Sequence, residues 1–113
     1  MSDINTITIS GRLTSDPELR HTTQGHPVCN FRLASNRTSK DSEGNKTDEA
    51  TFIEVIAWKQ LAEIVSKHCH KGDRIAVTGG IRYEEWNDRE TGLKRTKHQI
   101  RANEVMFLQL KES

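Results

Sequence analysis

A single helical segment interrupts a chain whose other ordered stretches alternate like β-strands. The segment covers about residues 59–70, where apolar side chains recur on one face of a helix: Leu61, Ile64, Val65 and Cys69. Lys67 and Lys71 suit the negative end of a helix, and Gly72 is a suitable C-terminal cap. Because helices and strands do not alternate along the chain, the pattern argues against a doubly wound parallel sheet.

Strand patterns lie on both sides of this helix. They cover "ITISGRL", "VCNFRLASNR" and "EATFIEVIAW" before it, and "RIAVTGGIRYEEW" and the residues to about Leu110 after it. A single helix between the third and fourth strands of a small β domain predicts an all-β fold, the OB fold, a five-stranded Greek-key barrel. We expect one domain at residues 1–110, followed by a short C-terminal end, residues 111–113, without an acidic tail.

Basic residues are unevenly distributed, although the net charge is only +1. Residues 19–40 contain four basic side chains and no acid: Arg20, Arg32, Arg37 and Lys40. Residues 89–101 contain five basic side chains and one acid, Glu90; the five are Arg89, Lys94, Arg95, Lys97 and Arg101. After folding, these stretches form either one face for nucleic-acid phosphates or ordinary solvated loops, and charge alone leaves both open.

Three aromatic rings lie at polar positions of their strands. Phe52 and Trp58 are six residues apart, so they share one strand face and stand roughly 20 Å apart along it. Glu54 shares that face, which is therefore at least partly solvated, and Trp86 follows the polar alternation of a later strand. Spaced exposed rings suit base stacking along a single strand, where each stack contributes about 1–3 kcal/mol. The alternative is that the rings cover neighbouring strands or lie in an oligomer contact.

The remaining aromatic and cysteine side chains are assigned to other roles. Phe31 and Phe107 lie at apolar positions and are predicted in the core, and Tyr83 is predicted to be at least half buried. Cys29 and Cys69 are interpreted as free thiols. With no signal peptide or membrane-length apolar run visible, they favour a cytoplasmic, nucleoid-associated protein.

Catalytic and metal-binding patterns are not evident. The run "HCH" at residues 68–70 has no second ligand pair at a useful spacing, so we expect no metal site. No Ser/His/Asp or Cys/His arrangement, paired carboxylates or phosphate-cradling glycine loop stands out. We therefore expect neither an enzyme nor a cofactor.

Several motifs, in order, resemble one known family. The stretch "ITISGRLTSDPELRHTTQGHPVCNFRLASNR" resembles the opening of bacterial single-stranded DNA-binding proteins. "FIEVIAWKQLAEIVSKHCHKGDRIAVTGGI" resembles their strand, helix and strand segment, and "ANEVMFL" resembles their closing strand. The resemblance covers about residues 4–110 and implies a homotetramer of OB folds around which DNA wraps.

The same resemblance implies four base-stacking positions. Three of them hold rings in this chain: Phe52, Trp58 and Trp86. The fourth is Ser39, where the family often has Trp, and Glu84 and Glu85 stand where it usually has basic residues. These departures predict weaker binding or a shifted DNA path. Arg95 matches a basic position after the hairpin tip.

The sequence thus predicts a protein that binds and protects single-stranded DNA without strong sequence preference, in DNA replication, recombination and repair. The predicted DNA contacts are the three rings and nine basic side chains: Phe52, Trp58, Trp86, Arg12, Arg32, Arg37, Lys40, Arg74, Arg82, Lys94, Arg95 and Lys97. The expected partners are single-stranded DNA and further copies of the chain, as a tetramer. Replication or repair proteins would bind through something other than an acidic tail, and no membrane is expected.

Two alternatives use the same fold. A primosomal, PriB-like accessory protein would be a dimer that acts mainly through protein partners, with DNA contact secondary. The retained rings disfavour this alternative. An OB module that binds only protein would place its rings in a protein interface instead.

Overall fold

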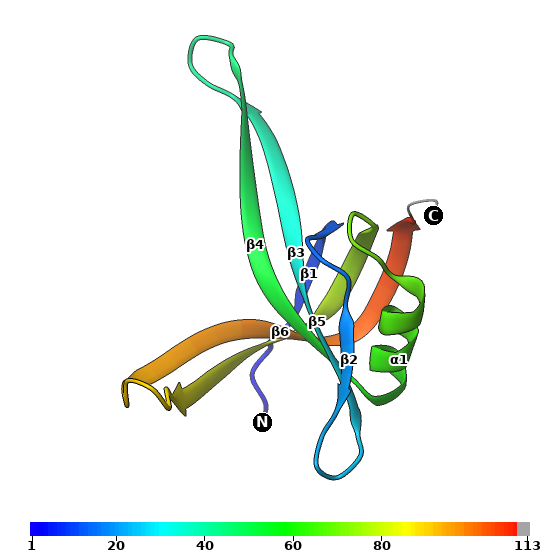
Figure 1. Cartoon of the computed structure of the whole chain (residues 1–113). Helices are drawn as coiled ribbons and strands as arrows, with labels where there is room; N and C mark the ends of the chain where they lie inside the picture. Colours follow the sequence, from blue (N-terminus) through cyan, green and yellow to red (C-terminus); the bar gives the residue numbers. More distant parts are fainter. Residues whose placement is uncertain (111–113) are drawn as a thin grey trace.

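The computed structural model describes residues 1–110 and is built from six strands and one helix (Figure 1). The elements are β1 (Ile7–Leu13), β2 (Glu18–His21), β3 (Pro27–Lys40), β4 (Lys46–Trp58), α1 (Lys59–His68), β5 (Arg74–Asn87) and β6 (Lys94–Gln109). The predicted C-terminal end, residues 111–113, lies outside the described residues. Within residues 1–110, no helix has the length and apolar character needed to cross a membrane.

The strands close into a barrel. Their order is β1-β5-β6-β4-β3-β2, and a further pairing between β1 and β3 joins the two ends of a five-stranded ring, with β2 attached outside it. Closure depends on a short parallel pairing of β4 with β6, where Val55 lies beside Ile100 and Ile56 beside Arg101. Along the chain, helix α1 follows β4, the third strand of this ring, and precedes β5, the fourth, as the sequence predicts.

Alternating strand residues fill the barrel interior. Cys29, Phe31 and Leu33 of β3 are buried there, as is Val65 of α1. Cys69 is also fully buried, deeper than its place at a helix end suggests. Burial raises the pKa of both thiols to about 11, so both are protonated near neutral pH.

Two long hairpins leave the barrel as arms (Figure 1). We call the outer part of β3 and β4 with residues 41–45 the β3–β4 arm, and the outer part of β5 and β6 with residues 88–93 the β5–β6 arm. The strands therefore extend well past the core. Ile81 and Tyr83 keep the alternation of the buried part of β5, yet they are 42% and 51% exposed because they lie on the arm, beyond the core cluster of the barrel.

Phe107, near the end of β6, is likewise 38% exposed, and its ring lies 6.2 Å from the ring of His68, centre to centre. The predictions that Phe107 lies in the core and that Tyr83 is at least half buried are therefore wrong for the isolated chain. The apolar alternation correctly predicts which face of the strand these residues share. It does not show whether another layer of the protein covers that face.

The β5–β6 arm begins at a tight crossing of two backbones. The register of β5 and β6 shifts between Thr78 and Gly79, where Gly79 lies opposite Ala102. A Cβ added to Gly79 would lie 1.9 Å from the carbonyl oxygen of Arg101. Only glycine allows the two strands to approach this closely, and this approach sets where the arm leaves the barrel.

Candidate nucleic-acid interface

Phe52 lies on the outward face of β4, opposite Ala34 of β3, with 51% of its surface exposed. The guanidinium carbon of Arg32 lies 4.6 Å from the centre of its ring. The same Arg32 places Nε 3.9 Å from Oε1 of Glu54, and both side chains of that ion pair are about half exposed. Because exposed ion pairs contribute little, Arg32 can exchange Glu54 for another anion at small cost.

Trp58 is the last residue of β4 and is partly exposed. The guanidinium carbon of Arg101 lies 5.9 Å from its ring centre, because the parallel pairing of β4 and β6 places Arg101 beside Ile56. A hollow of about 230 Å³ opens at this ring. It is lined by Ile56, Trp58, Arg82, Tyr83, Glu84, Gln99 and Arg101.

Trp86 lies on the β5–β6 arm, opposite Arg95, and is 45% exposed. The ammonium group of Lys97 lies 5.7 Å from its ring centre. Alternation along β5 places Arg82 and Glu84 on the same face as Trp86. Trp86 therefore shares a strand face with residues that line the hollow at Trp58.

Each of the three predicted rings thus carries one basic side chain over it. We call these rings with their neighbouring cations the ring face; it comprises Phe52, Trp58, Trp86, Arg32, Arg82, Arg95, Lys97 and Arg101. It crosses the adjacent strands β3, β4, β6 and β5. Flat π surfaces beside cations match what a single nucleic-acid strand offers, namely bases that stack and phosphates that carry negative charge.

Among residues 1–110, none of the other predicted basic side chains lies over one of the three rings. Lys94 pairs with Glu85 at 2.9 Å, on the opposite face of the β5–β6 arm from Trp86. Arg12 and Arg74 are neighbours on β1 and β5, around the barrel. The positions of Arg37 and Lys40 are on the β3–β4 arm.

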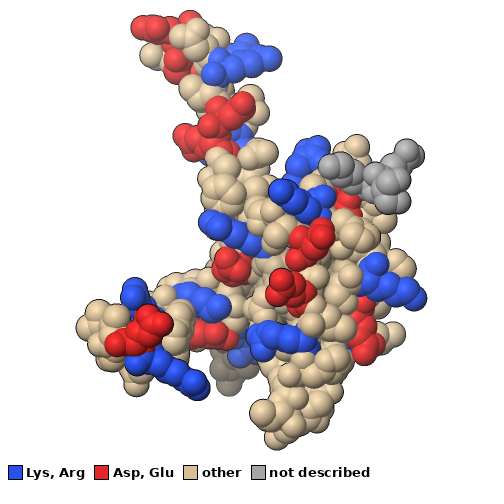
Figure 2. Space-filling view, in the orientation of Figure 1, with Lys and Arg blue, Asp and Glu red and all other residues tan. Residues whose placement is uncertain are grey.

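Basic and acidic side chains are interspersed rather than segregated. Figure 2 shows both signs of charge along both arms in that view. On the β3–β4 arm, Arg37 lies opposite Glu49, and the loop carries Asp41 and Glu43. The two basic stretches of the sequence therefore do not form one uniformly positive surface, and the cations that lie over rings are the distinctive ones.

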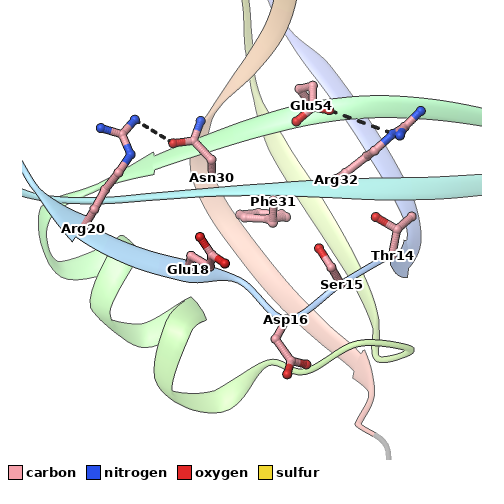
Figure 3. Close-up of a pocket in the computed structure, with 9 residues that line it drawn as sticks. All are labelled: Thr14, Ser15, Asp16, Glu18, Arg20, Asn30, Phe31, Arg32 and Glu54. Atoms are coloured by element: carbon pink, nitrogen blue, oxygen red, sulfur yellow. Dashed lines mark hydrogen bonds and ion pairs between the residues drawn. The ribbon is translucent and has the colours of Figure 1, made fainter.

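A second hollow, of about 590 Å³, lies beside Arg32 (Figure 3). At one side of it, Arg20 of β2 donates a hydrogen bond to Oδ1 of Asn30 on the neighbouring strand β3, at 2.8 Å. The hollow also holds three acidic side chains, Asp16, Glu18 and Glu54. The acids outnumber the cations there, so this hollow is a poorer site for phosphate than the ring face.

The two predicted departures from the family pattern have definite places. Ser39 lies on the opposite face of the β3–β4 arm from Phe52, and its hydroxyl is 2.9 Å from that of Thr47. The carboxylate of Glu85 accepts hydrogen bonds from Lys94 and from the hydroxyl of Tyr83, which hold its pKa below the ordinary value. Glu84 instead lies on the ring face.

Sequence reasoning missed three residues near the rings. Arg101 belonged to a recognised basic stretch, but its position over Trp58 depends on the parallel pairing of distant strands. Arg20 also belonged to a recognised basic stretch, but no DNA contact was predicted for it. Nothing in the sequence marked Gln99, because an amide side chain among charged residues is expected to be exposed. In the structure it is only 1% exposed.

The sequence of the whole described barrel matches a known family. Residues 4–108 match the single-strand binding protein family. The chain belongs to this family. The family consists of binding proteins, in agreement with the prediction that the chain is not an enzyme.

Individual members of the single-strand binding protein family are similar over most of the chain. Single-stranded DNA-binding protein 1 of Chlorobaculum tepidum is 34% identical, over 97% of this chain and 68% of that protein. The single-stranded DNA-binding protein of Helicobacter hepaticus is 37% identical, over 96% of this chain and 64% of that protein. The single-stranded DNA-binding protein of Borreliella burgdorferi is 38% identical, over 88% of this chain and 66% of that protein. The chain therefore spans about two thirds of the length of these relatives.

A solved structure supports the fold. A Plasmodium falciparum SSB in complex with single-stranded DNA matches with a TM-score of 0.83, over 96% of this chain and 97% of that chain. The two sequences are 21% identical, so the similarity concerns the fold. The predicted OB fold is confirmed.

Proposed function

We propose that this protein binds and protects single-stranded DNA, with bases stacked on Phe52, Trp58 and Trp86. The observation that carries the proposal is that each ring is exposed or partly exposed and has a basic side chain over it. The relatives are single-stranded DNA-binding proteins, which supports the same ligand. Because every base has a π face, stacking on rings tolerates most sequences.

The cations over the rings explain how both parts of a nucleotide are bound. In the free protein Arg32, Lys97 and Arg101 lie over Phe52, Trp86 and Trp58, where they shield the rings from water. A base that stacks on the ring displaces the cation sideways, and the phosphate of the same nucleotide arrives beside it. Each cation then exchanges a weak ring contact for a charge-assisted hydrogen bond.

Titration with an oligo-dT at several salt concentrations tests this proposal. Both tryptophans are on the ring face, so we expect strong quenching of tryptophan emission on binding. The five cations of the ring face, each on one phosphate, would give a slope of log K against log salt of about −3.5 per protomer. No quenching at any salt would contradict the proposal and favour a ring-lined protein interface.

We further propose that the chain acts as a homo-oligomer, expected to be a tetramer. Residues 7–10 of β1 pair only with β5 among the described strands, so their other edge is open to a second copy. On the outer side of β6, Met106 and Leu108 are 57% and 48% exposed and supply apolar surface nearby. Light scattering should give four times the chain mass of 12.9 kDa. A twofold mass would favour the PriB-like alternative.

We also propose a cellular setting for this activity. DNA replication, recombination and repair all expose single strands, and a protein that coats them serves each process. The two free, buried thiols Cys29 and Cys69 suit a reducing cytoplasm with access to the nucleoid. Replication or repair enzymes would then be partners that meet the protein on DNA.

A further inference from the structure

The hollow at Trp58 contains a buried amide that is only half satisfied. Gln99 is 1% exposed and lines the hollow together with Glu84. Its Nε2 donates a hydrogen bond to Oε1 of Glu84, at 2.6 Å. Its Oε1 is buried and has no hydrogen-bond partner among residues 1–110. Buried polar atoms are nearly always paired, so an unpaired acceptor beside a binding hollow points to a missing donor.

The Gln99–Glu84 contact fixes the chemistry of this site. Because Nε2 donates to the carboxylate, the amide orientation is set and Oε1 must be an acceptor. Glu84 adds a carboxylate, whose oxygens accept hydrogen bonds when ionised. Beside the guanidinium groups of Arg82 and Arg101, the hollow therefore offers acceptors, and a ligand there should present donors.

Nucleobases differ in what their edges offer such acceptors. Cytosine presents an amino group, N4, as a donor, whereas thymine presents the O4 acceptor at the equivalent place. Adenine and guanine also carry amino groups. A base stacked on Trp58 with an amino group toward Glu84 gains a hydrogen bond, whereas thymine would meet a carboxylate with a carbonyl oxygen.

We infer that the hollow formed by Trp58, Glu84 and Gln99 selects bases that carry an amino group over thymine. Glu84 is the specificity-determining residue, and Gln99 is a positioning residue that holds its carboxylate. The inference rests on the proposed function and refines it at one of the three stacking positions. Arg82 and Arg101 line the same hollow and remain free to meet the phosphate of the selected nucleotide.

A simpler role for Glu84 is repulsion. A carboxylate on the ring face would weaken binding of every oligonucleotide to the same degree, because phosphate charge does not depend on the base. The two roles therefore differ in one measurable quantity, the ratio of the affinities for oligo-dC and oligo-dT. Glu85 offers a matched control, because it is the neighbouring acid but lies on the other face of the arm.

The experiment compares the binding of oligo-dC and oligo-dT by the wild-type protein, Glu84→Gln and Glu85→Gln at pH 8. Both variants remove one negative charge and preserve side-chain size. Glu84→Gln is expected to lower the dC-to-dT affinity ratio by about fivefold or more, and Glu85→Gln to leave it unchanged. Equal ratios in all three proteins would overturn the inference while leaving the proposed function intact. Wild-type protein that binds neither oligonucleotide would overturn both.

A second probe changes the DNA instead of the protein. An oligonucleotide of N4,N4-dimethylcytosine keeps the ring and phosphates of oligo-dC but lacks the amino donors. Wild-type protein is expected to bind it about fivefold or more weakly than oligo-dC, and Glu84→Gln to bind the two about equally. If wild-type protein does not distinguish the two, selection through the amino group is wrong.

Discussion

The double variant Trp58→Ala, Trp86→Ala is expected to weaken binding of single-stranded DNA by about 2–6 kcal/mol. Each stacked base contributes about 1–3 kcal/mol, and the two contributions add when the sites act independently. The cations over the rings, Arg101 and Lys97, stay in place, so phosphate contacts should survive. Affinity should therefore fall while the salt dependence of the remaining binding is retained.

Anisotropy of a labelled oligo-dT is the suitable measurement, because the chain has only these two tryptophans and their emission is lost in the variant. His98→Ala is the matched control. His98 is exposed and does not line the hollow at Trp58; it lies on the opposite face of the β5–β6 arm from Trp86, stacked on Tyr83 with ring centres 5.3 Å apart. Its removal is expected to change the affinity by less than about 0.5 kcal/mol. A loss as large as that of the tryptophans would contradict the assignment of one binding face.

Alternation along single strands could be read from the sequence, and it located the rings correctly. Phe52, Glu54 and Trp58 share one face of β4 because side chains alternate in any extended strand, whatever lies beside it. The same rule explains the exposed Trp86. It lies on the face of β5 that never points into the barrel, even where β5 is part of it.

Contacts between distant strands could not be read in this way. Arg101 reaches Trp58 only because β4 and β6 pair in parallel at the point where the barrel closes. Lys94 was assigned to DNA as part of a basic stretch, but the hairpin register places it with Glu85, away from Trp86. Charge along a sequence therefore predicts a basic neighbourhood, whereas the pairing of strands decides which cation meets which ring.

The replacement Gly79→Ala is expected to destabilise the fold by about 3 kcal/mol or more. The added Cβ would lie 1.9 Å from the carbonyl oxygen and 2.9 Å from the carbonyl carbon of Arg101. Both atoms belong to the backbone of β6, so no side chain can turn away to make room. Relief requires β5 and β6 to separate at their bulge, which costs more than ordinary overpacking of a core. Urea unfolding would measure the loss.

Gly80→Ala is the control for this prediction, because its Cβ would lie 3.1 Å from the carbonyl oxygen of Asn5 and 3.5 Å from Cγ and Oδ1 of the same residue, with no closer contact. The N-terminal segment that carries Asn5 can shift by a few tenths of an ångström, so we expect a loss below about 1 kcal/mol. Equal losses in the two variants would mean that the crossing at Gly79 is not tight. If Gly79→Ala still folds, separation of the strands moves Arg101 relative to Trp58. Affinity for single-stranded DNA should then fall as well, because the β6 backbone at this crossing carries Arg101, which lies over Trp58.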